Sequence, residues 1–506
     1  MKEKFYITTP IYYPSSNFHI GHCYTTVIAD AISRYKREKG YDVFFLTGTD
    51  EHGQKIQKKA EEAGVTPKEY VDKIVENTKE LWSELGITYD KFIRTTDEEH
   101  VAIVQKIFKK LYDQGDIYKG SYKGQYCTPC ESFWTESQLV DGKCPDCGRE
   151  VHEVSEDAYF FKLSKYQHQL EEYLETHPEF IEPASRKNEM LNNFIRPGLE
   201  DLCVSRTSFN WGIPVSFDEK HVVYVWIDAL SNYITALGYL TEDDSNFKKY
   251  WPADIHIVGK EIVRFHTIIW PIMLMALGLE LPKKVFGHGW LVIDGGKISK
   301  SLGNYRDPRE YTNEYSVDAV RYFLLREVPF GSDGNFSEEA LITRTNGDLA
   351  NVLGNLVNRT IGMCNKYFGG VIPESHELNE LDQNLIDYVM SVPTLVDEKI
   401  NVLDIPAALE TIIELFRKCN KYIDETMRWV LAKEEDKTRL ETVIYNLLAS
   451  IKHGAVAIRP FLPTTAEKIF EQLNITNSDI TTFASLESGA KLGEAKPLFM
   501  RIDKNV

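Results

Sequence analysis

The chain has 506 residues and a formal net charge of −18, because 76 acidic residues outnumber 58 lysines and arginines. Hydrophobic residues make up 43% and charged residues 26%, which is ordinary for soluble globular proteins and excludes wholesale disorder or a fibrous repeat. The acidic excess argues against broad wrapping in nucleic acid or adhesion to an anionic membrane, but it allows a local basic groove. At roughly 150 residues per domain, this length predicts three or four domains.

No targeting or membrane segment is predicted. The residues before Pro10 hold no apolar run long enough for a signal peptide. The longest apolar stretch, Thr267–Leu281, is shorter than a membrane span and contains Pro271 and Glu280, so we expect a buried helix. Eight cysteines in a chain of this size do not make a disulfide framework. We therefore expect a reducing, cytoplasmic location and no membrane partner.

The first part of the chain alternates strand and helix patterns. Lys4–Thr9 and Asp42–Thr47 are β-rich runs, and between them Cys23–Lys39 has the apolar spacing of a helix. This order is a βαβ unit, which implies a parallel sheet with a right-handed crossover. A capping box with proline at the first helical position opens a second helix over Thr66–Leu85, and a third follows around Val101–Leu111.

The pattern changes at about Tyr118, where glycine, cysteine and aromatic residues interleave through Gly148 and suggest an inserted module. Strand patterns return at Val222–Trp226, Ile255–Gly259 and Val285–Ile293. After about residue 337 only helical patterns occur, which predicts a helix bundle. The clearest of these helices are Leu349–Ile361, Leu385–Val402, Ala407–Tyr422 and Leu440–Ile458.

The segment Phe18–His22 (FHIGH) lies between the first predicted strand and the first predicted helix. Helix N-termini attract anions because their unpaired N–H groups and the helix dipole point at them. Two imidazoles, His19 and His22, across a glycine that lets a ligand approach, suit the binding of triphosphate oxygens. A metal pair or two ordinary loop histidines are the alternatives, and the strand–loop–helix context favours the nucleotide.

A second charged motif is Gly295–Ser301 (GGKISKS), in which Lys297 and Lys300 stand beside two serines. Two ammonium groups and two hydroxyls within five residues suit the binding of a departing pyrophosphate. Taken alone, however, a solvated surface loop is the better interpretation of this segment.

Together, in this order and on either side of an interrupted α/β region, the two motifs resemble the HIGH and KMSKS signatures of class I aminoacyl-tRNA synthetases. The second motif has Ile298 in place of methionine, but both lysines and both serines remain. The resemblance spans essentially the whole chain and is closest to the methionyl-tRNA synthetases. Further matching blocks are TPIYYP (9–14), GTDEHG (48–53), YVWIDA (224–229) and GKEIVRFH (259–266).

Two Cys-x-x-Cys pairs, Cys127 with Cys130 and Cys144 with Cys147, are separated by thirteen residues. Four thiolates at this spacing suit a closed tetrahedral zinc site, whereas a redox dithiol would need only one pair. Disulfides are disfavoured by the expected compartment. Because no coordination position is left open, we expect a structural Zn²⁺ that holds a module too small to own a core.

The resemblance also implies a methionine site, with Asp50 holding the α-ammonium group. Methionine offers a polarizable thioether and little hydrogen bonding, so its pocket should be apolar and aromatic. Without the resemblance, Trp226 and Ile262 would be ordinary core residues and Asp50 a surface turn residue. The implied side-chain pocket is lined by Ile11, Tyr13, Trp226, Ala229, Leu230, Tyr233, Ile262 and His266. The implied ATP-binding residues are His19, Gly21, His22, Gly259, Lys260, His288, Trp290, Lys297, Ser299 and Lys300.

In the helical part, the resemblance implies anticodon contacts by Asn355, Arg359 and Trp429. Anticodon bases are single-stranded, so stacking on tryptophan and edge hydrogen bonds from asparagine and arginine suit their recognition. A core position in the bundle is the alternative for Trp429. Isoleucyl, leucyl and valyl enzymes carry a large editing insertion, yet only about 100 residues separate Tyr118 from Val222. A cysteinyl enzyme would be expected to use zinc in its substrate pocket.

The predicted fold class is α/β: a Rossmann-type doubly wound parallel sheet interrupted by a zinc-binding insertion and followed by a C-terminal α-helix bundle. The expected domains are the first catalytic half (1–117), the connective insertion with its zinc knuckle (118–221), the second catalytic half (222–295), the KMSKS loop and stem-contact region (296–345) and the anticodon-binding domain (346–506).

The resemblance implies an ATP-dependent, AMP-forming ligase that joins L-methionine to tRNA(Met), whose anticodon is CAU, with Mg²⁺ accompanying ATP. Its expected catalytic residues are His19, His22, Lys297 and Lys300. Two alternatives stay open. One is another adenylating or nucleotidyl-transfer enzyme with a HIGH-type loop, and the other is a non-catalytic tRNA-binding relative. The sequence leaves the oligomeric state undecided.

Overall fold

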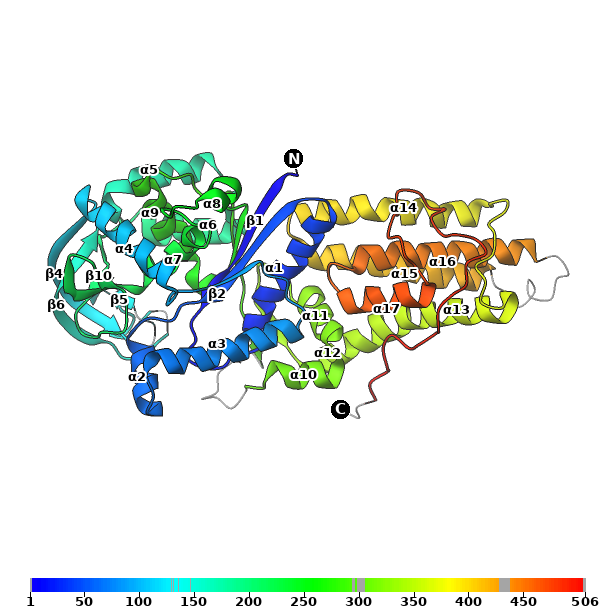
Figure 1. Ribbon diagram of the computed structural model, residues 1–506, viewed down its shortest axis with the longest axis horizontal. Helices are drawn as coiled ribbons and strands as arrows, with labels where there is room; N and C mark the ends of the chain where they lie inside the picture. Colours follow the sequence, from blue (N-terminus) through cyan, green and yellow to red (C-terminus); the bar gives the residue numbers. More distant parts are fainter. Residues whose placement is uncertain are drawn as a thin grey trace. The chain divides into compact units, whose positions relative to one another are not determined.

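The computed structural model describes residues 2–128, 130, 132–134, 136–145, 147–293, 296–297, 305–426 and 437–503. Two compact units make up the chain, Met1–Trp290 and Leu291–Val506 (Figure 1). Among the helices in these ranges, none combines the length and apolarity that a membrane span requires.

A six-stranded parallel sheet forms the centre of the first unit, with strand order β3-β2-β1-β12-β13-β7. Its strands are β1 Lys4–Tyr12, β2 Asp42–Thr49, β3 Lys91–Arg94, β7 Ile181–Glu182, β12 Ile255–Gly259 and β13 Val285–His288. From β1 the sheet continues outward through β2 and β3, and from β12 it continues to β13, with the earlier strand β7 at that edge. Strands extend on both sides of the β1–β12 pair, so the sheet is doubly wound, as predicted. The switch point lies between β1 and β12, where such sheets bind their ligands beyond the carboxyl ends of the strands.

Helices pack around this sheet and bury its apolar residues. They are α1 Ile20–Glu38, α2 Gln54–Ala63, α3 Pro67–Glu84, α4 Glu98–Asp113, α5 Leu163–Thr176, α6 Ala184–Met190, α7 Val225–Thr235, α8 Ser245–Tyr250 and α9 Trp270–Leu277. The predicted capping box at the start of α3 is confirmed. The N–H of Glu69 donates to the Thr66 hydroxyl at 3.2 Å, and the Glu69 carboxylate accepts the N–H of Thr66 at 2.9 Å.

One strand prediction was wrong at its end. The run predicted as a strand over Val222–Trp226 divides between β11, Asp218–Val223, and helix α7, which begins at Val225. Strand β11 pairs antiparallel with β9 (Ser205–Arg206) and β10 (Pro214–Val215) in a separate small sheet. A short apolar run has no period that separates a buried strand from the first turn of a buried helix, so the sequence could not locate this boundary.

The last predicted strand is also two elements. Strand β13 ends at His288, and Leu291–Ile293 forms β14, which belongs to a different three-stranded sheet with β15 (Gly296–Lys297) and β16 (Gly334–Phe336). The boundary between the two compact units falls between β13 and β14.

The insertion is built on a long antiparallel hairpin. Strand β4 (Ile117–Cys127) pairs with β6 (His152–Phe161), and the short strands β5 (Ser132–Trp134) and β8 (Leu202–Cys203) flank them. In Figure 1, β4 and β6 curve along the outer edge of the first unit. The range assigned to the insertion also supplies β7, the edge strand of the main sheet, so part of it belongs structurally to the parallel sheet.

The second unit is mainly helical. Its helices are α10 Pro308–Tyr315, α11 Val317–Arg326, α12 Glu338–Arg344, α13 Asn355–Phe368, α14 Glu380–Asn401, α15 Ile405–Thr426, α16 Thr438–Ile458 and α17 Pro463–Leu473. Helices α14, α15 and α16 lie side by side (Figure 1), which confirms the predicted bundle. At Gly454 of α16, a Cβ would stand 2.3 Å from the Phe416 ring of α15, so a larger residue there would displace this ring or the helix that carries it.

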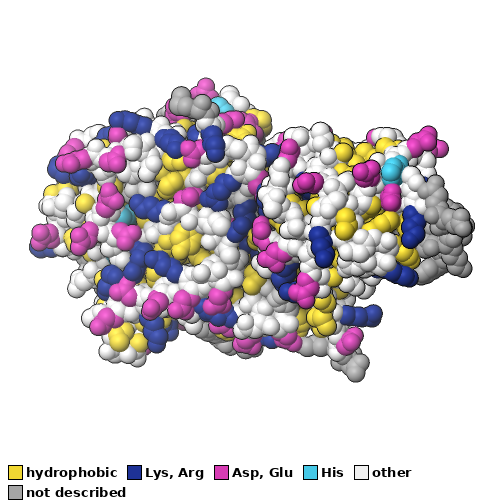
Figure 2. All heavy atoms as spheres, turned by 45° about the vertical axis from the view of Figure 1, so that its right-hand side comes forward, with side chains coloured by type: hydrophobic (Ala, Val, Ile, Leu, Met, Phe, Trp, Pro, Cys, Tyr) yellow, Lys and Arg dark blue, Asp and Glu magenta, His cyan; other side chains and the backbone are white. Residues whose placement is uncertain are grey.

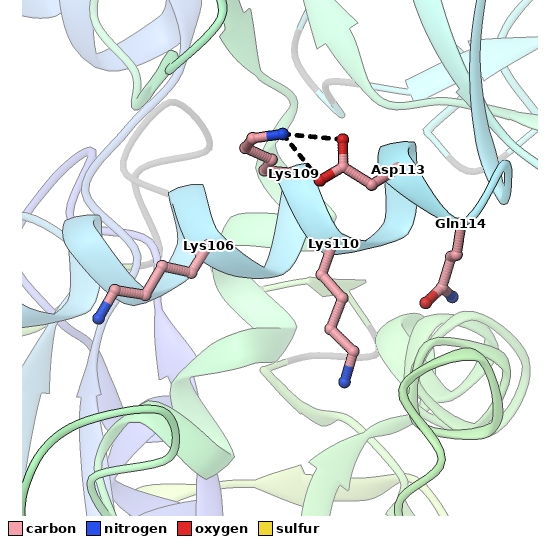
Figure 3. A pocket seen from close by; sticks show the side chains of 5 residues that line it. All are labelled: Lys106, Lys109, Lys110, Asp113 and Gln114. Atoms are coloured by element: carbon pink, nitrogen blue, oxygen red, sulfur yellow. Dashed lines mark hydrogen bonds and ion pairs between the residues drawn. The ribbon is translucent and has the colours of Figure 1, made fainter.

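Surface charges do not gather on the face shown in Figure 2, where acidic and basic side chains are interspersed. One surface pocket lies on α4 and is lined by Lys106, Lys109, Lys110, Asp113 and Gln114 (Figure 3). Lys109 is paired with Asp113 at 2.7 Å, and Lys110 points to the carbonyl of Leu277 at 3.5 Å. The residues that the sequence predicts for catalysis do not line this pocket.

Candidate active site

His19 and His22 stand at the start of α1, directly after the loop that leaves β1. His19 is the N-cap residue, and its Nδ1 accepts the backbone N–H of Gly21 at 3.1 Å. The Nδ1 atom of His22 accepts the backbone N–H of His19 at 3.0 Å. Because Nδ1 is the acceptor in both rings, a neutral imidazole at either position carries its proton on Nε2. The predicted strand–loop–helix setting of the motif is confirmed.

The two rings also pack against each other, with centroids 4.0 Å apart, and Phe18 stacks on His22 at 4.5 Å. A Cβ at Gly21 would come within 2.9 Å of Cε1 of His19, which explains why glycine separates the two histidines. The motif is therefore held rigidly by its own backbone and by one buried aromatic ring.

An apolar wall is formed by α7 and by the segment Phe265–Ile269, a single-turn π-helix. Trp226 stacks face to face on Phe265, with ring centroids 3.5 Å apart and planes inclined by 7°. Ala229 and Leu230 are buried on the same helix. Single-turn π-helices are frequent at functional sites.

Tyr233 and His266, both predicted for the pocket, are in direct contact. The Tyr233 hydroxyl and His266 Nε2 are 2.6 Å apart, and His266 Nδ1 lies 2.9 Å from the carbonyl oxygen of Ile262. The carbonyl can only accept, so Nδ1 carries the proton and Nε2 accepts from the tyrosine. Burial lowers the pKa of His266 to about 4, which keeps this ring neutral. The pair offers a neutral, hydrogen-bonded surface to an uncharged side chain.

Asp50 follows the last residue of β2 and is 6% exposed. Its backbone N–H donates to the carbonyl of Tyr12 at 2.9 Å, which places it beside the end of β1, where Ile11 and the half-buried Tyr13 lie. Burial raises the pKa of the Tyr233 hydroxyl, and the negative charge of Asp50 contributes to the same shift. The carboxylate is therefore an electrostatic neighbour of the apolar wall.

The other side of the switch point carries the residues predicted for ATP. Gly259 and His288 are paired in register at the ends of β12 and β13. The Lys260 ammonium lies 4.1 Å from the centroid of the Trp290 ring, and Trp290 Nε1 donates to the Glu261 carboxylate at 2.7 Å. Sequence reasoning missed Glu261 and Phe265, although both lie inside the GKEIVRFH block.

His288 is buried, and its two ring nitrogens contact the protein. Nδ1 lies 2.7 Å from the carbonyl of Gly289, and Nε2 lies 2.8 Å from the Thr25 hydroxyl. Burial lowers the pKa of His288, so the ring is neutral and links β13 to α1.

Lys297 belongs to β15 of the second unit, and its side chain is outside the described part of the chain. Ser299, Lys300 and Trp429 lie outside the described residues altogether.

The four predicted metal ligands converge. The Sγ atoms of Cys127, Cys130, Cys144 and Cys147 all lie within 4.8 Å of one another, and those of Cys127 and Cys147 are 3.6 Å apart. Sulfurs bound to one tetrahedral zinc at about 2.3 Å stand about 3.8 Å apart. The cluster can therefore hold a metal ion, as the spacing of the cysteines predicted.

The surroundings of the cluster fit a structural role. The carbonyl of Cys144 accepts the N–H of Gly148 at 2.8 Å, which closes the turn of the second pair. Trp134, Leu139 and Val151 pack against the cysteines as a small separate cluster. Burial raises the pKa of the Cys127 thiol to about 12, so a cation is needed to hold this sulfur as a thiolate.

Comparison with known proteins decides the family. The family model "tRNA synthetases class I (M)" matches residues 5–155 and 148–361, and the model "Anticodon binding domain of methionyl tRNA ligase" matches residues 372–505. The chain belongs to the class I (M) family of tRNA synthetases. The motif-based prediction of the family is confirmed, and the fold class is that of its members.

Relatives named methionine–tRNA ligase match this class I synthetase over nearly its full length. The protein of Caldanaerobacter subterraneus is 64% identical over 99% of this chain and 80% of its own length, and that of Clostridium acetobutylicum is 62% identical over 99% and 79%. A crystal structure of Mycobacterium tuberculosis methionyl-tRNA synthetase bound by methionyl-adenylate superposes with a TM-score of 0.94. It is 40% identical and covers 98% of this chain and 100% of its own.

In this synthetase, the residues predicted for the anticodon lie on α13. Asn355 is the first residue of α13 and is exposed, and Arg359 follows one helical turn later. The Arg359 guanidinium lies 3.5 Å from the Asp424 carboxylate of α15. Both predicted residues therefore border the same exposed strip of the bundle, and they fall within the range matched by the synthetase model rather than the anticodon model.

Proposed function

We propose that this chain is a methionine–tRNA ligase that converts L-methionine and ATP to methionyl-adenylate and pyrophosphate and then transfers the methionyl group to tRNA(Met). The observation that carries the proposal is that two features occur together at the switch point of one sheet. They are the His19–His22 capping box and the neutral Tyr233–His266 pair of the apolar wall. Relatives named methionine–tRNA ligase at 62% and 64% identity support it, as does a 40% identical structure that binds methionyl-adenylate.

In the first step, the methionine carboxylate attacks the α-phosphate of ATP in line, the bond to pyrophosphate breaks, and methionyl-adenylate forms. A carboxylate is already ionised at neutral pH, so this step needs no general base. Catalysis therefore consists of positioning and of charge stabilisation in the transition state.

His19 and His22 donate to phosphate oxygens through Nε2–H in this proposal, because their Nδ1 atoms already accept backbone N–H groups. Lys297 and Lys300 neutralise the departing pyrophosphate from their loop, with Ser299 as a hydroxyl donor. Mg²⁺ bound to ATP adds positive charge at the same oxygens. Gly21, Gly259, Lys260, His288 and Trp290 form the remainder of the ATP-binding set.

Methionine binds with its ammonium group at Asp50 and its side chain against the apolar wall. The half-buried Trp226 and the buried Tyr233 suit a polarizable thioether, and a neutral His266 avoids placing a charge beside it. The proposed pocket consists of Ile11, Tyr13, Trp226, Ala229, Leu230, Tyr233, Ile262 and His266.

In the second step, the terminal ribose of tRNA(Met) takes the methionyl group through its 2′-hydroxyl, as class I membership implies. Asn355, Arg359 and Trp429 read the CAU anticodon by edge hydrogen bonds and stacking. The exposed position of Asn355 at the start of α13 supports this role.

The metal of the cysteine cluster is a structural Zn²⁺ in this proposal, since the 3.6 Å sulfur separation suits tetrahedral zinc and the four thiol ligands leave no position for substrate. The catalytic halves at 1–117 and 222–295, the insertion at 118–221, the KMSKS region at 296–345 and the anticodon-binding domain at 346–506 remain proposed boundaries. We assign the enzyme to the cytoplasm, where translation uses its product.

ATP–pyrophosphate exchange with each of the twenty amino acids, without tRNA, tests the proposal. We expect exchange with methionine and little with any other amino acid. Exchange with isoleucine, leucine, valine or cysteine in place of methionine would overturn the pocket assignment but keep the class of chemistry. No exchange with any amino acid would contradict tRNA-independent adenylate formation.

A further inference from the structure

A buried carboxylate that belongs to none of the sites described so far joins two histidines. Asp228 of α7 is completely buried, and each of its oxygens faces one imidazole. His52 Nδ1 lies 2.6 Å from one oxygen, and His100 Nε2 lies 2.7 Å from the other. His52 follows β2, and His100 is on α4, so the cluster connects three elements that are far apart in sequence.

Proton positions in this cluster follow from chemistry. A carboxylate only accepts, so His52 must carry a proton on Nδ1 and His100 on Nε2. Burial alone would raise the pKa of Asp228, but the nearby charges and hydrogen bonds of His52 and His100 outweigh it and lower that pKa. The other nitrogen of His100 lies 2.7 Å from the hydroxyl of Thr235, which is also on α7. Each oxygen of the ionised carboxylate therefore accepts a hydrogen bond from one histidine.

The position of Asp228 on α7 gives the cluster its significance. Trp226 and Tyr233 are seven residues apart and face the same side of the helix, whereas Asp228 is about 200° away from Trp226 around the helix axis. The cluster therefore contacts α7 on the side of the helix that is opposite the apolar wall. At its other end, His52 is two residues from Asp50, the proposed ammonium acceptor.

The loop that carries Asp50 is also fixed on its other sides. Trp211 Nε1 donates to the carbonyl of Glu51 at 2.6 Å, and the Arg94 guanidinium holds the Glu51 carboxylate with contacts of 2.7 and 2.9 Å. These contacts attach the loop to β3 and to the segment before β10. The contact between His52 and Asp228 attaches it to the pocket wall.

Helix α4 carries His100 near its N-terminal end and is hydrogen-bonded to α9 at its C-terminal end. Figure 3 shows the side chains of Lys110 and Gln114 near the C-terminal end of α4. They donate to the carbonyls of Leu277 and Ala276 at 3.5 and 2.8 Å, at the C-terminal end of α9. Side chains with positive charge or N–H donors are favourable at such helix ends. These two contacts tie the C-terminal end of α4 to α9, and His100 lies in the first turn of the same helix.

We propose that His52, Asp228 and His100 are positioning residues for methionine, which fix the separation between the Asp50 carboxylate and the apolar wall of α7. The inference rests on the proposed function, because it assigns methionine to the space between these two parts. The His52 contact binds the Asp50 loop to α7, and the His100 contact binds the other oxygen of the same carboxylate to α4. Loss of either one frees Asp228 on that side and lets the ammonium acceptor and the wall move apart.

Amide substitutions test this proposal, because asparagine places its amide near the position of imidazole Nδ1 and glutamine near that of Nε2. At position 52 the required donor is Nδ1–H, and at position 100 it is Nε2–H. His52→Asn and His100→Gln should therefore retain the contact, whereas His52→Gln and His100→Asn should lose it. Lys109→Ala, which removes an exposed side chain from α4, serves as the control.

The measurement is the Kd of methionine for the full chain by calorimetry without ATP, together with the KM of ATP in pyrophosphate exchange. We expect His52→Gln and His100→Asn to raise the methionine Kd about tenfold, and the two retaining variants and the control less than about threefold. The KM of ATP should stay within about twofold in all of them.

The opposite rankings of the same two amides at positions 52 and 100 are the signature of the proposed contacts. The same ranking at both positions, an unchanged methionine Kd in all four variants, or a parallel rise in the KM of ATP would overturn the proposal. Methionine binding is measured without catalysis. A wild-type chain that binds methionine but shows no exchange would therefore count against the proposed function and leave this comparison decisive.

Discussion

The Nδ1 atom of His22 accepts the backbone N–H of His19 at 3.0 Å, so this nitrogen caps the helix and the other ring nitrogen, Nε2, carries the proton. The same division holds in His19, whose Nδ1 accepts from Gly21. Capping and phosphate binding are therefore assigned to different atoms of the same side chain. Substitutions that imitate one nitrogen but not the other should separate helix stability from catalysis.

The variants His22→Asn and His22→Gln should separate the contribution of His22 to helix stability from its contribution to catalysis. Asparagine can keep an acceptor near the Nδ1 position but has no donor at Nε2, so the rate of adenylate formation should fall by about 10²–10³ while stability is retained. Glutamine can keep a donor near Nε2 but loses the cap, which should cost about 1 kcal/mol of stability and less of the rate. Single-turnover adenylate formation and thermal unfolding measure the two effects.

Methionine affinity provides the control for these variants, because His22 is expected to act in the transition state rather than in methionine binding. An unchanged single-turnover rate in His22→Asn would contradict the role of Nε2–H. A matching loss of methionine affinity would show that the substitution disturbs the pocket as well.

Lys300→Ala should lower the single-turnover rate of adenylate formation by about 10²–10³, equivalent to about 3–4 kcal/mol of transition-state stabilisation. The reason is the loss of one positive charge opposite the departing pyrophosphate. Lys300→Arg keeps the charge and should recover part of the rate. If alanine and arginine variants both react at the wild-type rate, the KISKS segment is a surface loop and has no part in the reaction.

Local signals in the sequence were sufficient for much of this fold. The capping box at Thr66 and the strand that begins at Lys4 depend on residues close together in the chain, so a single sequence predicts them. The four cysteines were predicted to meet because their spacing reports the metal site directly. These predictions needed no knowledge of long-range contacts.

Other features depend on contacts that a sequence pattern does not encode. The edge strand β7 has two residues, too few to show a period of two. The stacking of Trp226 on Phe265 joins two segments that are distant in the sequence. Phe265 lies in a π-helical turn, which no residue type in the sequence predicts. The contacts of Asp228 come from residues 52 and 100, and only the assembled fold brings them together.

The pKa of His266 gives a prediction for pH dependence. Burial lowers it to about 4 in the folded protein, below the ordinary value of 6.5, so between these values the unfolded chain binds the extra proton. Stability should therefore fall as the pH drops from about 6.5 to about 4, by up to about 3 kcal/mol from this residue. His266→Gln should reduce the slope of the unfolding temperature against pH over this window.

Methionine binding is the companion measurement. A ring with a pKa of about 4 is neutral from pH 6 to pH 8, so the Kd of methionine should change less than about twofold over that range on account of His266. A strong weakening below pH 7 that disappears in His266→Gln would mean that the ring titrates near neutrality and that its burial is less complete than the fold indicates.

Removal of the metal should loosen the insertion. Cys147→Ser removes one ligand of the four-cysteine cluster, so we expect the loss of about one equivalent of zinc per chain and faster proteolysis within residues 118–160. Cys364→Ser changes a buried cysteine outside the cluster and should keep the zinc. Zinc content by elemental analysis and the pattern of limited proteolysis measure the result. Equal zinc in both variants would refute the site.

Recognition of tRNA should be separable from amino-acid activation. Arg359→Ala and Trp429→Ala should leave methionine-dependent pyrophosphate exchange within about twofold of wild type, because neither residue is proposed to contact ATP or methionine. Loss of an edge hydrogen bond or a stacking partner is worth about 1–3 kcal/mol, so the KM of tRNA(Met) in charging should rise about tenfold or more.

Lys366→Ala removes one positive charge from the same helix as Arg359 and tests for a general electrostatic effect. If Lys366→Ala weakens charging as much as Arg359→Ala, the helix attracts tRNA through its charge and Arg359 does not read a base. If exchange falls together with charging in Trp429→Ala, that tryptophan supports the fold of the bundle.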